Sequence, residues 1–198
     1  MIGAVAVRSD SIIKKITFTA IFTALCCIGT VSIAIPLPTG YVNVGDVFVL
    51  LSAWLLGPLY GTVAAGFGSC LADVLAGFPI YAPATLLIKA GVALIGYYFS
   101  VLIKRLIKKA PNFTCRILAV IFAEGFMLLG YFVFETALYG ISTATLTLLG
   151  NGLQGLICGA IAVLVSVALA PIKYVNNTFP HFSLKRLTGD KKQKQNKI

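Results

Sequence analysis

Ionisable side chains inside apolar stretches are the residues of this sequence that could do chemistry. Charged groups are costly in lipid and commonly mark binding or transport sites. Four of them interrupt apolar segments and a fifth lies at the edge of one; they are Asp73, Lys89, Glu124, Glu135 and, at the edge, Asp46. Carboxylate and ammonium groups bind polar solutes through charge and hydrogen bonds. The sequence therefore predicts a polar binding site inside a membrane.

The composition of the chain explains why these groups must lie in lipid. Of the 198 residues, 59% are hydrophobic and 11% are charged, whereas soluble domains average about 45–50% and about 25%. Apolar segments follow one another along the sequence at 16–35, 47–56, 60–76, 84–103, 117–138 and 144–171. Because a helix crosses the bilayer with about 20 residues, we predict an all-α membrane protein with six transmembrane helices.

The distribution of basic residues predicts the orientation of these helices. The net charge of +10 raises the question of nucleic-acid binding, but 15 of the 16 Lys and Arg residues flank the apolar segments or lie in the 104–116 loop. Three loops hold no Lys or Arg: those near 36–45, 77–83 and 139–143. Because Lys and Arg collect on the cytoplasmic side, we expect cytoplasmic N- and C-termini and no nucleic-acid partner. The expected parts are a cytoplasmic N-terminal segment, a membrane domain and a basic cytoplasmic tail: residues 1–13, 14–172 and 173–198.

The predicted helices carry polar side chains to one depth. Successive helices run in opposite directions, so the end of one segment and the start of the next meet in the outer third of the bilayer. The residues at this depth are Asp46, Asp73, Lys89, Glu135, Asn151 and Gln154. Glu124, Tyr131 and Glu135 share one stripe of the fifth segment, since the eleven residues from first to last make about three helical turns. The pattern indicates an outward-facing pocket for a small, planar, polar solute.

Two structural explanations compete with a binding pocket. Asp73 or Glu135 could pair with Lys89 as a structural ion pair, and the amides near residue 151 could form hydrogen bonds between helices. Glu124 lies deeper than the other groups. It could instead be a protonated acid that satisfies backbone or hydroxyl groups within the bundle.

Motifs for ATP, dinucleotide or metal chemistry are absent from the sequence or lie in the wrong context. Residues 150–155 match G-x-G-x-x-G but sit in an apolar helix with no preceding strand. There is no phosphate-binding P-loop and no H-E-x-x-H, and His181 is the only histidine. We therefore expect no catalytic residue, cofactor or metal, and a substrate-capturing subunit driven by partner proteins.

Two other classes remain as alternatives. A small integral-membrane enzyme acting on a lipid or isoprenoid would place paired acidic residues on the cytoplasmic side, whereas here the acidic residues lie outward. An accessory or structural subunit would show no outward polar cluster. Both alternatives fit the distribution of polar residues less well than a solute-binding subunit does.

Several short stretches carry a resemblance to a known family. They are TAIFTA at 19–24, NVGD at 43–46, GPLYG at 57–61, AD at 72–73 with YAPAT at 81–85 and Lys89, the 124–135 stretch, and NGLQG at 151–155. Together they resemble the S components of energy-coupling factor (ECF) transporters over about residues 14–172. The resemblance is greatest to the riboflavin-type subgroup, which includes S components for hydroxymethylpyrimidine and pyridoxine-like compounds.

The resemblance implies a multi-pass S component in a prokaryotic cell membrane that binds a vitamin or vitamin precursor near the outer face. It also implies docking on a transmembrane scaffold subunit driven by two ABC-type ATPases. In that family an A-x-x-x-A pattern on the first helix contacts the scaffold, and Ala20 and Ala24 match it, although packing within the bundle would use the same spacing. The expected substrate-binding residues are Asp46, Asp73, Tyr81, Lys89, Glu124, Tyr131, Glu135, Asn151 and Gln154.

Overall fold

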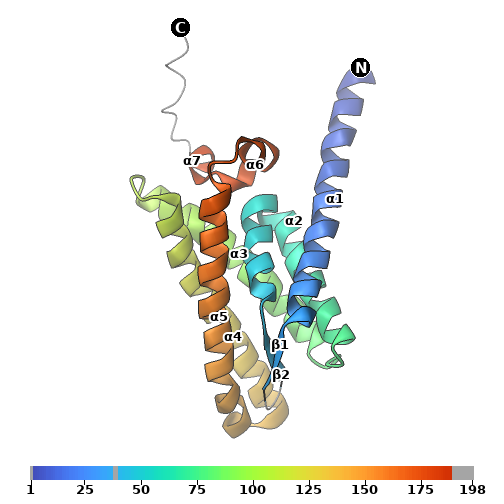
Figure 1. Cartoon of the computed structure of the whole chain (residues 1–198), viewed down its shortest axis with the longest axis vertical. Coiled ribbons are helices and arrows are strands. Elements are labelled where there is room, and N and C mark those ends of the chain that lie inside the picture. Colours follow the sequence, from blue (N-terminus) through green and yellow to red (C-terminus); the bar gives the residue numbers. More distant parts are fainter. Residues whose placement is uncertain (1, 38–39, 189–198) are drawn as a thin grey trace.

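Long helices packed side by side form the body of the protein (Figure 1). The computed structural model describes residues 2–37 and 40–188. Within this part of the chain, five helices are long and apolar enough to cross a membrane. They are α1 (Ile2–Ser32), α2 (Gly45–Leu75), α3 (Ala82–Leu106), α4 (Asn112–Tyr139) and α5 (Ile141–Leu169). The prediction of an all-α membrane protein is confirmed at this level, with one small β-hairpin added.

Helix α2 contains two of the predicted segments and folds back on itself at Gly57. Gly57 has a φ of 85° and precedes Pro58, and both features interrupt helical hydrogen bonding. The Ser52 hydroxyl donates a hydrogen bond to the Gly61 carbonyl across the fold, at 3.1 Å. A Cβ at Gly61 would lie only 2.6 Å from the Ser52 carbonyl oxygen. The backbones of the two halves of α2 are therefore in contact, which is possible because Gly61 has no side chain.

The fold divides α2 into two limbs, residues 45–56 and 58–75. The first limb is about 18 Å long at 1.5 Å per residue, whereas the hydrocarbon core is about 30 Å thick. The sequence pattern predicts six separate helices, and α2 holds two of them as its limbs, joined at the non-helical Gly57; six membrane crossings stay a prediction. Asp46 lies at the start of the first limb and Asp73 near the end of the second. Because the limbs run in opposite directions, both residues lie at the same end of the bundle.

A β-hairpin connects α1 to α2, in the uncharged loop where no strand was expected. Strands β1 (Ala34–Leu37) and β2 (Gly40–Asn43) pair antiparallel, with Ala34 opposite Asn43. The hairpin is attached to α5 through Asn43. Its backbone N–H donates to Gln154 Oε1 at 2.8 Å, and its carbonyl accepts from Cys158 Sγ at 3.3 Å. These two bonds hold the end of β2 against the middle of α5.

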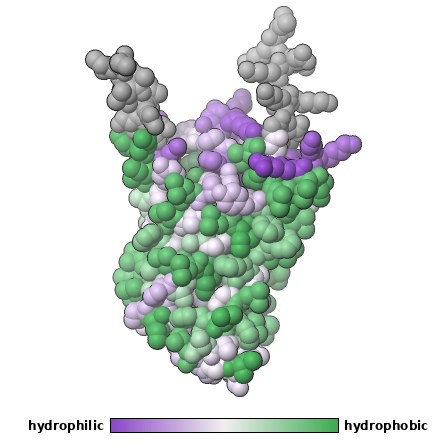
Figure 2. Space-filling model, turned by 180° about the vertical axis from the view of Figure 1, so that it is seen from behind, coloured by the Kyte–Doolittle hydropathy of each residue, from purple (hydrophilic) through white to green (hydrophobic). Residues whose placement is uncertain are grey.

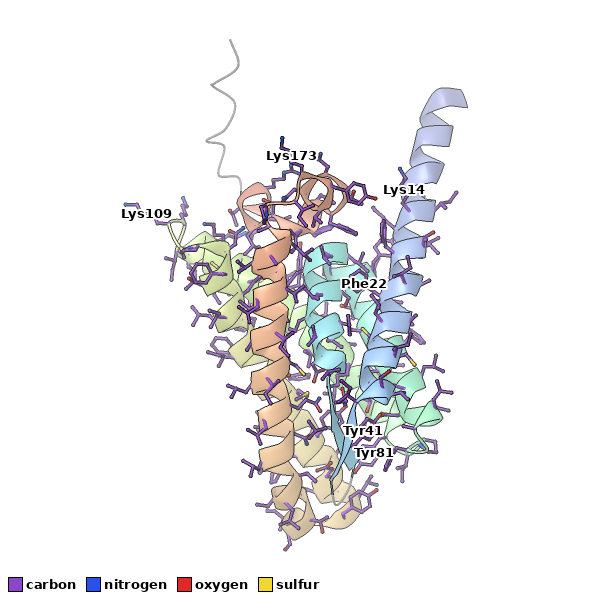
Figure 3. The ribbon with its side chains drawn as sticks, in the orientation of Figure 1. Lys14, Phe22, Tyr41, Tyr81, Lys109 and Lys173 are labelled. Carbon is purple, nitrogen blue, oxygen red and sulfur yellow. The ribbon has the colours of Figure 1, made fainter. Side chains whose placement is uncertain are left out.

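The two ends of the bundle differ in polarity. Apolar side chains cover most of the flank seen in Figure 2, and hydrophilic ones gather at one end. Lys14, Lys109 and Lys173 lie at that end, which we call the basic end, and Tyr41 and Tyr81 lie toward the opposite one, the hairpin end (Figure 3). α1 begins and α5 finishes at the basic end (Figure 1). The charge separation expected from the sequence is therefore present in three dimensions.

The segment after α5 packs onto the basic end instead of leaving the bundle. It forms α6 (Lys173–Thr178), the 3-10 turn η1 (Pro180–Phe182) and α7 (Leu184–Leu187). Phe182 and Leu184 are 2% and 1% exposed. Part of the expected basic tail is thus a folded cap, while residues 189–198 lie outside the described part of the chain.

Arg116 and His181 attach this cap to the helices. Arg116 Nη2 donates to the Phe182 carbonyl at 2.7 Å, and its guanidinium lies over the rings of Phe182 and Trp54. His181 Nδ1 lies 2.9 Å from the Tyr97 hydroxyl. Burial, reinforced by nearby Lys15, lowers the pKa of the His181 imidazole. His181 is therefore half-buried and belongs to the contact between the cap and α3.

Candidate functional site

A cleft at the hairpin end is lined by side chains from the hairpin and four helices. The lining residues are Tyr41 and Asn43 of β2, Asp73 of α2, Phe78 and Tyr81 from the turn before α3, Thr85 of α3, Tyr131 and Glu135 of α4, and Asn151 and Gln154 of α5. The space that they surround is small, about 40 Å³, and it opens to solvent on one side. Segments distant in sequence thus form one site.

Six of the nine predicted substrate-binding residues line this cleft: Asp73, Tyr81, Tyr131, Glu135, Asn151 and Gln154. The lining residues that were not predicted are Tyr41, Asn43, Phe78 and Thr85. Asn43 and Thr85 belong to stretches that carry the family resemblance, which could have pointed to them. Tyr41 and Phe78 lie in connections whose conformation no local pattern indicates.

Asp46 and Lys89 lie beneath the cleft as a buried ion pair and do not line it. Their side chains are 0% and 3% exposed, and Lys89 Nζ lies 2.6 Å from Asp46 Oδ1. Lys89 Nζ also lies 2.9 Å from Met127 Sδ. The predicted structural ion pair of Lys89 therefore exists, but its acidic partner is Asp46, not Asp73 or Glu135.

Gln154 connects this ion pair to the hairpin. Its side-chain N–H donates to Asp46 Oδ2, and its carbonyl oxygen accepts from the Asn43 backbone at 2.8 Å. Both ends of the Gln154 amide are used, so the side chain is held in one orientation. The floor of the cleft is thereby fixed by residues from the hairpin, α2, α3 and α5.

Two carboxyl groups face the cleft in different surroundings. Asp73 Oδ1 accepts a hydrogen bond from the Tyr41 hydroxyl at 2.8 Å, and Oδ2 is buried without a hydrogen-bond partner among the described residues. Glu135 accepts from the Thr147 hydroxyl and lies 3.5 Å from the Tyr81 hydroxyl. Burial, reinforced by Asp73, raises the pKa of the Tyr41 phenol well above its usual range. Tyr41 therefore stays a hydrogen-bond donor.

Aromatic rings form part of the wall around these carboxyl groups. The Tyr41 and Phe78 ring centroids are 5.3 Å apart, and those of Tyr81 and Phe134 are also 5.3 Å apart. The Tyr131 hydroxyl lies 3.1 Å from Thr85 Oγ1. Flat apolar faces with a few fixed polar groups suit a planar, polar solute.

Glu124 lies outside the cleft lining. Its side chain is 8% exposed, and neither carboxyl oxygen has a hydrogen-bond partner among residues 2–37 and 40–188. It fills the space left by Gly155, where a Cβ would come within 2.9 Å of Glu124 Cβ. Glu124 is therefore a buried acid that neither lines the cleft nor, among the described residues, makes the hydrogen bonds to backbone or hydroxyl groups that the structural interpretation expected.

Ala20 and Ala24 lie on an open face of α1. Both side chains are exposed, whereas Phe22 and Cys26, on the other side of the same helix, are buried. The pair therefore does not pack within the bundle. It forms a smooth strip on which another helix could come close.

The described residues offer no site for a metal ion, since no three His, Cys, Asp or Glu side chains among them are placed to hold one. The chemistry that the cleft supports is solute binding through stacking, hydrogen bonds and charge. The side chains that provide these interactions come from the hairpin and four helices.

Comparison with known proteins connects this geometry to a family. Residues 11–171 match the family described as "ECF-type riboflavin transporter, S component". An uncharacterized protein of Pyrococcus woesei is 34% identical over 146 residues, which cover 72% of this chain and 93% of the relative. A solved structure described as "Structure and mechanism of the S component of a bacterial ECF transporter" has a TM-score of 0.61 and 22% identity, covering 83% of this chain and 97% of that one. The solved structure shows a shared fold.

Proposed function

The chain belongs to the ECF-type riboflavin transporter S component family, and on that premise we propose that it captures a vitamin or vitamin precursor in the cleft for import. The main support for this proposal is the cleft, where polar groups from the hairpin and four helices lie close together beside aromatic rings. S components are transport subunits and not enzymes. A lipid-modifying membrane enzyme is not favoured, since Asp73 and Glu135 line the cleft together with Tyr41 and Tyr81, which lie toward the end opposite the labelled lysines (Figure 3).

The proposed orientation places the basic end in the cytoplasm and the cleft toward the outside. Lys and Arg favour the cytoplasmic side of a membrane, and the labelled lysines mark one end of the bundle (Figure 3). Counting the two limbs of α2 separately, the chain would cross the bilayer six times in a prokaryotic cell membrane. A solute would then enter the cleft from outside, beside the hairpin.

Uptake would depend on partner proteins. In the proposed assembly, a transmembrane scaffold subunit and two ABC-type ATPases supply the energy, and the exposed strip of Ala20 and Ala24 contacts the scaffold. Candidate solutes are riboflavin, hydroxymethylpyrimidine and pyridoxine-like compounds. All of them present a flat heteroaromatic ring to the aromatic wall and polar substituents to the carboxyl and amide groups.

Mass spectrometry of the purified chain tests the proposed capture of a solute. We expect a small heteroaromatic molecule to copurify with the wild-type chain and to be lost from an Asn151→Leu variant, because the leucine fills part of the cleft and removes an amide. Asn177→Leu, on the exposed face of α6 at the basic end, is the matched control and should keep the molecule. Equal retention in both variants, or a wild-type chain without any bound small molecule, would contradict the proposal.

A further inference from the structure

We propose that the basic end of the bundle binds the headgroups of anionic phospholipids. Seven exposed Lys and Arg side chains are present among those that the structure describes. They come from α1, from the end of α3 and the loop after it, and from the cap: Lys14, Lys15, Arg105, Lys108, Lys109, Lys173 and Arg186. This inference adds a lipid partner to the proposed function and does not depend on which solute the cleft takes.

The exposed cations have no acidic partner among the side chains that the structure describes. Those side chains include four carboxyl groups, all of them buried: Asp46, Asp73, Glu124 and Glu135. The one ion pair that these groups make joins Asp46 to Lys89 inside the bundle. Lys15 lies over a tyrosine ring and Arg186 donates to a backbone carbonyl, and neither contact balances a charge. The basic end therefore carries positive charge that a partner can neutralise.

Exposed apolar side chains stand beside these cations in three separate segments. The segments are 12–16 of α1, 105–109 at the end of α3, and 172–174 at the start of α6. Their exposed apolar members are Ile12, Ile13, Ile16, Leu106, Ile107, Ile172 and Tyr174. Leu106 and Tyr174 are 74% and 67% exposed. Each segment therefore combines side chains suited to acyl chains with side chains suited to phosphate.

Lipid fits this mixture of side chains better than an acidic protein in water does. Exposed Leu, Ile and Tyr side chains gain free energy when they leave water for acyl chains, and Tyr is enriched at membrane surfaces. Long Lys and Arg side chains can lie along an apolar surface while their charged ends reach the headgroups. The headgroup phosphates then accept charge-assisted hydrogen bonds. Each Lys or Arg at an anionic surface raises the affinity about fivefold.

The cap holds its part of this surface in place. The Phe179 ring packs edge-on against that of Phe18 in α1, with the ring centroids 4.8 Å apart. The labelled Lys14, Lys109 and Lys173 lie at the same end of the bundle but apart from one another (Figure 3). The cations thus spread across this end and do not form one pocket, which suits several headgroups and not a single free phosphate.

Native mass spectrometry of the full-length chain tests the proposed lipid preference. The purified protein is titrated in detergent with phosphatidylglycerol, or with phosphatidylcholine that carries the same acyl chains. We expect phosphatidylglycerol to bind about 10-fold more tightly, a difference that one to two surface cations can supply. Salt screens exposed charges, so the ratio of the two affinities should fall as the concentration of ammonium acetate rises.

A variant that combines Lys108→Gln, Lys109→Gln and Lys173→Gln should lose most of this preference. We expect the ratio of phosphatidylglycerol affinity to phosphatidylcholine affinity to fall about fivefold or more, because the variant lacks three of the seven exposed cations. Arginine at the same three positions keeps the charge and should keep the wild-type ratio. All three positions are exposed, so an equal affinity for phosphatidylcholine in the three proteins checks that the fold is intact.

Three results would overturn the inference and leave the proposed capture of a solute untouched. One is equal binding of the two lipids by the wild-type chain, and another is a preference that salt does not change. The third is the same affinity ratio in the glutamine variant as in the wild-type chain. If that variant keeps the lipid preference but no longer supports uptake with its partner proteins, the basic end binds a protein and not lipid, and the inference is again wrong.

Discussion

Replacing Lys89 with methionine is expected to destabilise the protein by about 3–5 kcal/mol, the usual effect of removing one partner of a buried ion pair. The Asp46 carboxylate is fully buried and would lose the ammonium group that lies 2.6 Å away. Gln154 would remain as its only other side-chain hydrogen-bond donor among those described for it. The floor of the cleft should therefore loosen, because Gln154 also holds the hairpin through Asn43.

A double-mutant cycle measures this contribution by unfolding the purified chain in mixed micelles. Asp46→Asn with Lys89→Met removes both charges and should recover most of the stability lost by Lys89→Met alone. Lys173→Met, at an exposed position, is the control and should change the free energy of unfolding by less than about 0.5 kcal/mol. Two results would contradict this role of the ion pair. One is a loss of unfolding free energy in the double variant equal to the sum of the losses in the two single variants, and the other is a loss below about 1 kcal/mol in Lys89→Met.

Tryptophan at both Ala20 and Ala24 is expected to abolish uptake while leaving solute binding unchanged. The two alanines form an exposed strip on α1, away from the cleft residues. Bulky side chains there would hold a partner helix away from α1 and prevent close backbone packing. The measurements are uptake of labelled solute by cells that contain the complete transporter and the affinity of the isolated chain for the same solute.

Tryptophan at Ala160 and Ala168 provides the matched control. Both alanines are exposed on α5, so the substitution adds the same bulk to another flank of the bundle. Uptake should persist in this control if docking is confined to the α1 strip. Normal uptake by the Ala20 and Ala24 variant, or equal loss in both variants, would count against the assigned docking face.

Much of the fold could be predicted because lipid imposes simple requirements on sequence. Long apolar runs with charged ends can only be membrane helices, and the structure places α1, α3, α4 and α5 where such runs occur. The tight turn at Gly57 was visible as GPLYG. That the limbs on either side pack against each other depends on contacts between Gly61 and Ser52, which no local pattern reveals.

The cleft could be predicted in part for the same reason. Asp73, Glu135 and Asn151 stand out because polar groups are rare in apolar helices, and all three line the cleft. Lys89 stands out equally, but the sequence does not reveal that Asp46 neutralises it. Tyr41 could not be found, because its position depends on a hairpin held by distant contacts with α5.

The cap at the basic end escaped prediction because its helices are short, with six and four residues. Phe182 and Leu184 do not belong to a run of apolar residues at helical spacing that is long enough to predict a helix. Phe182 is held by Arg116 of α4, whose guanidinium also lies over Trp54 of α2. Segments that fold only against a completed bundle leave little local signal in their own sequence.

An experimental structure of the chain with its copurified solute would test the central claim most directly, since it locates the solute. The account predicts a small molecule in the cleft at the hairpin end, in contact with the hairpin and with residues of at least three helices, among them Asp73 and Asn151. A solute bound at the basic end or between lipid-facing helices would contradict the account. So would a structure in which these side chains face lipid with no enclosed space between them.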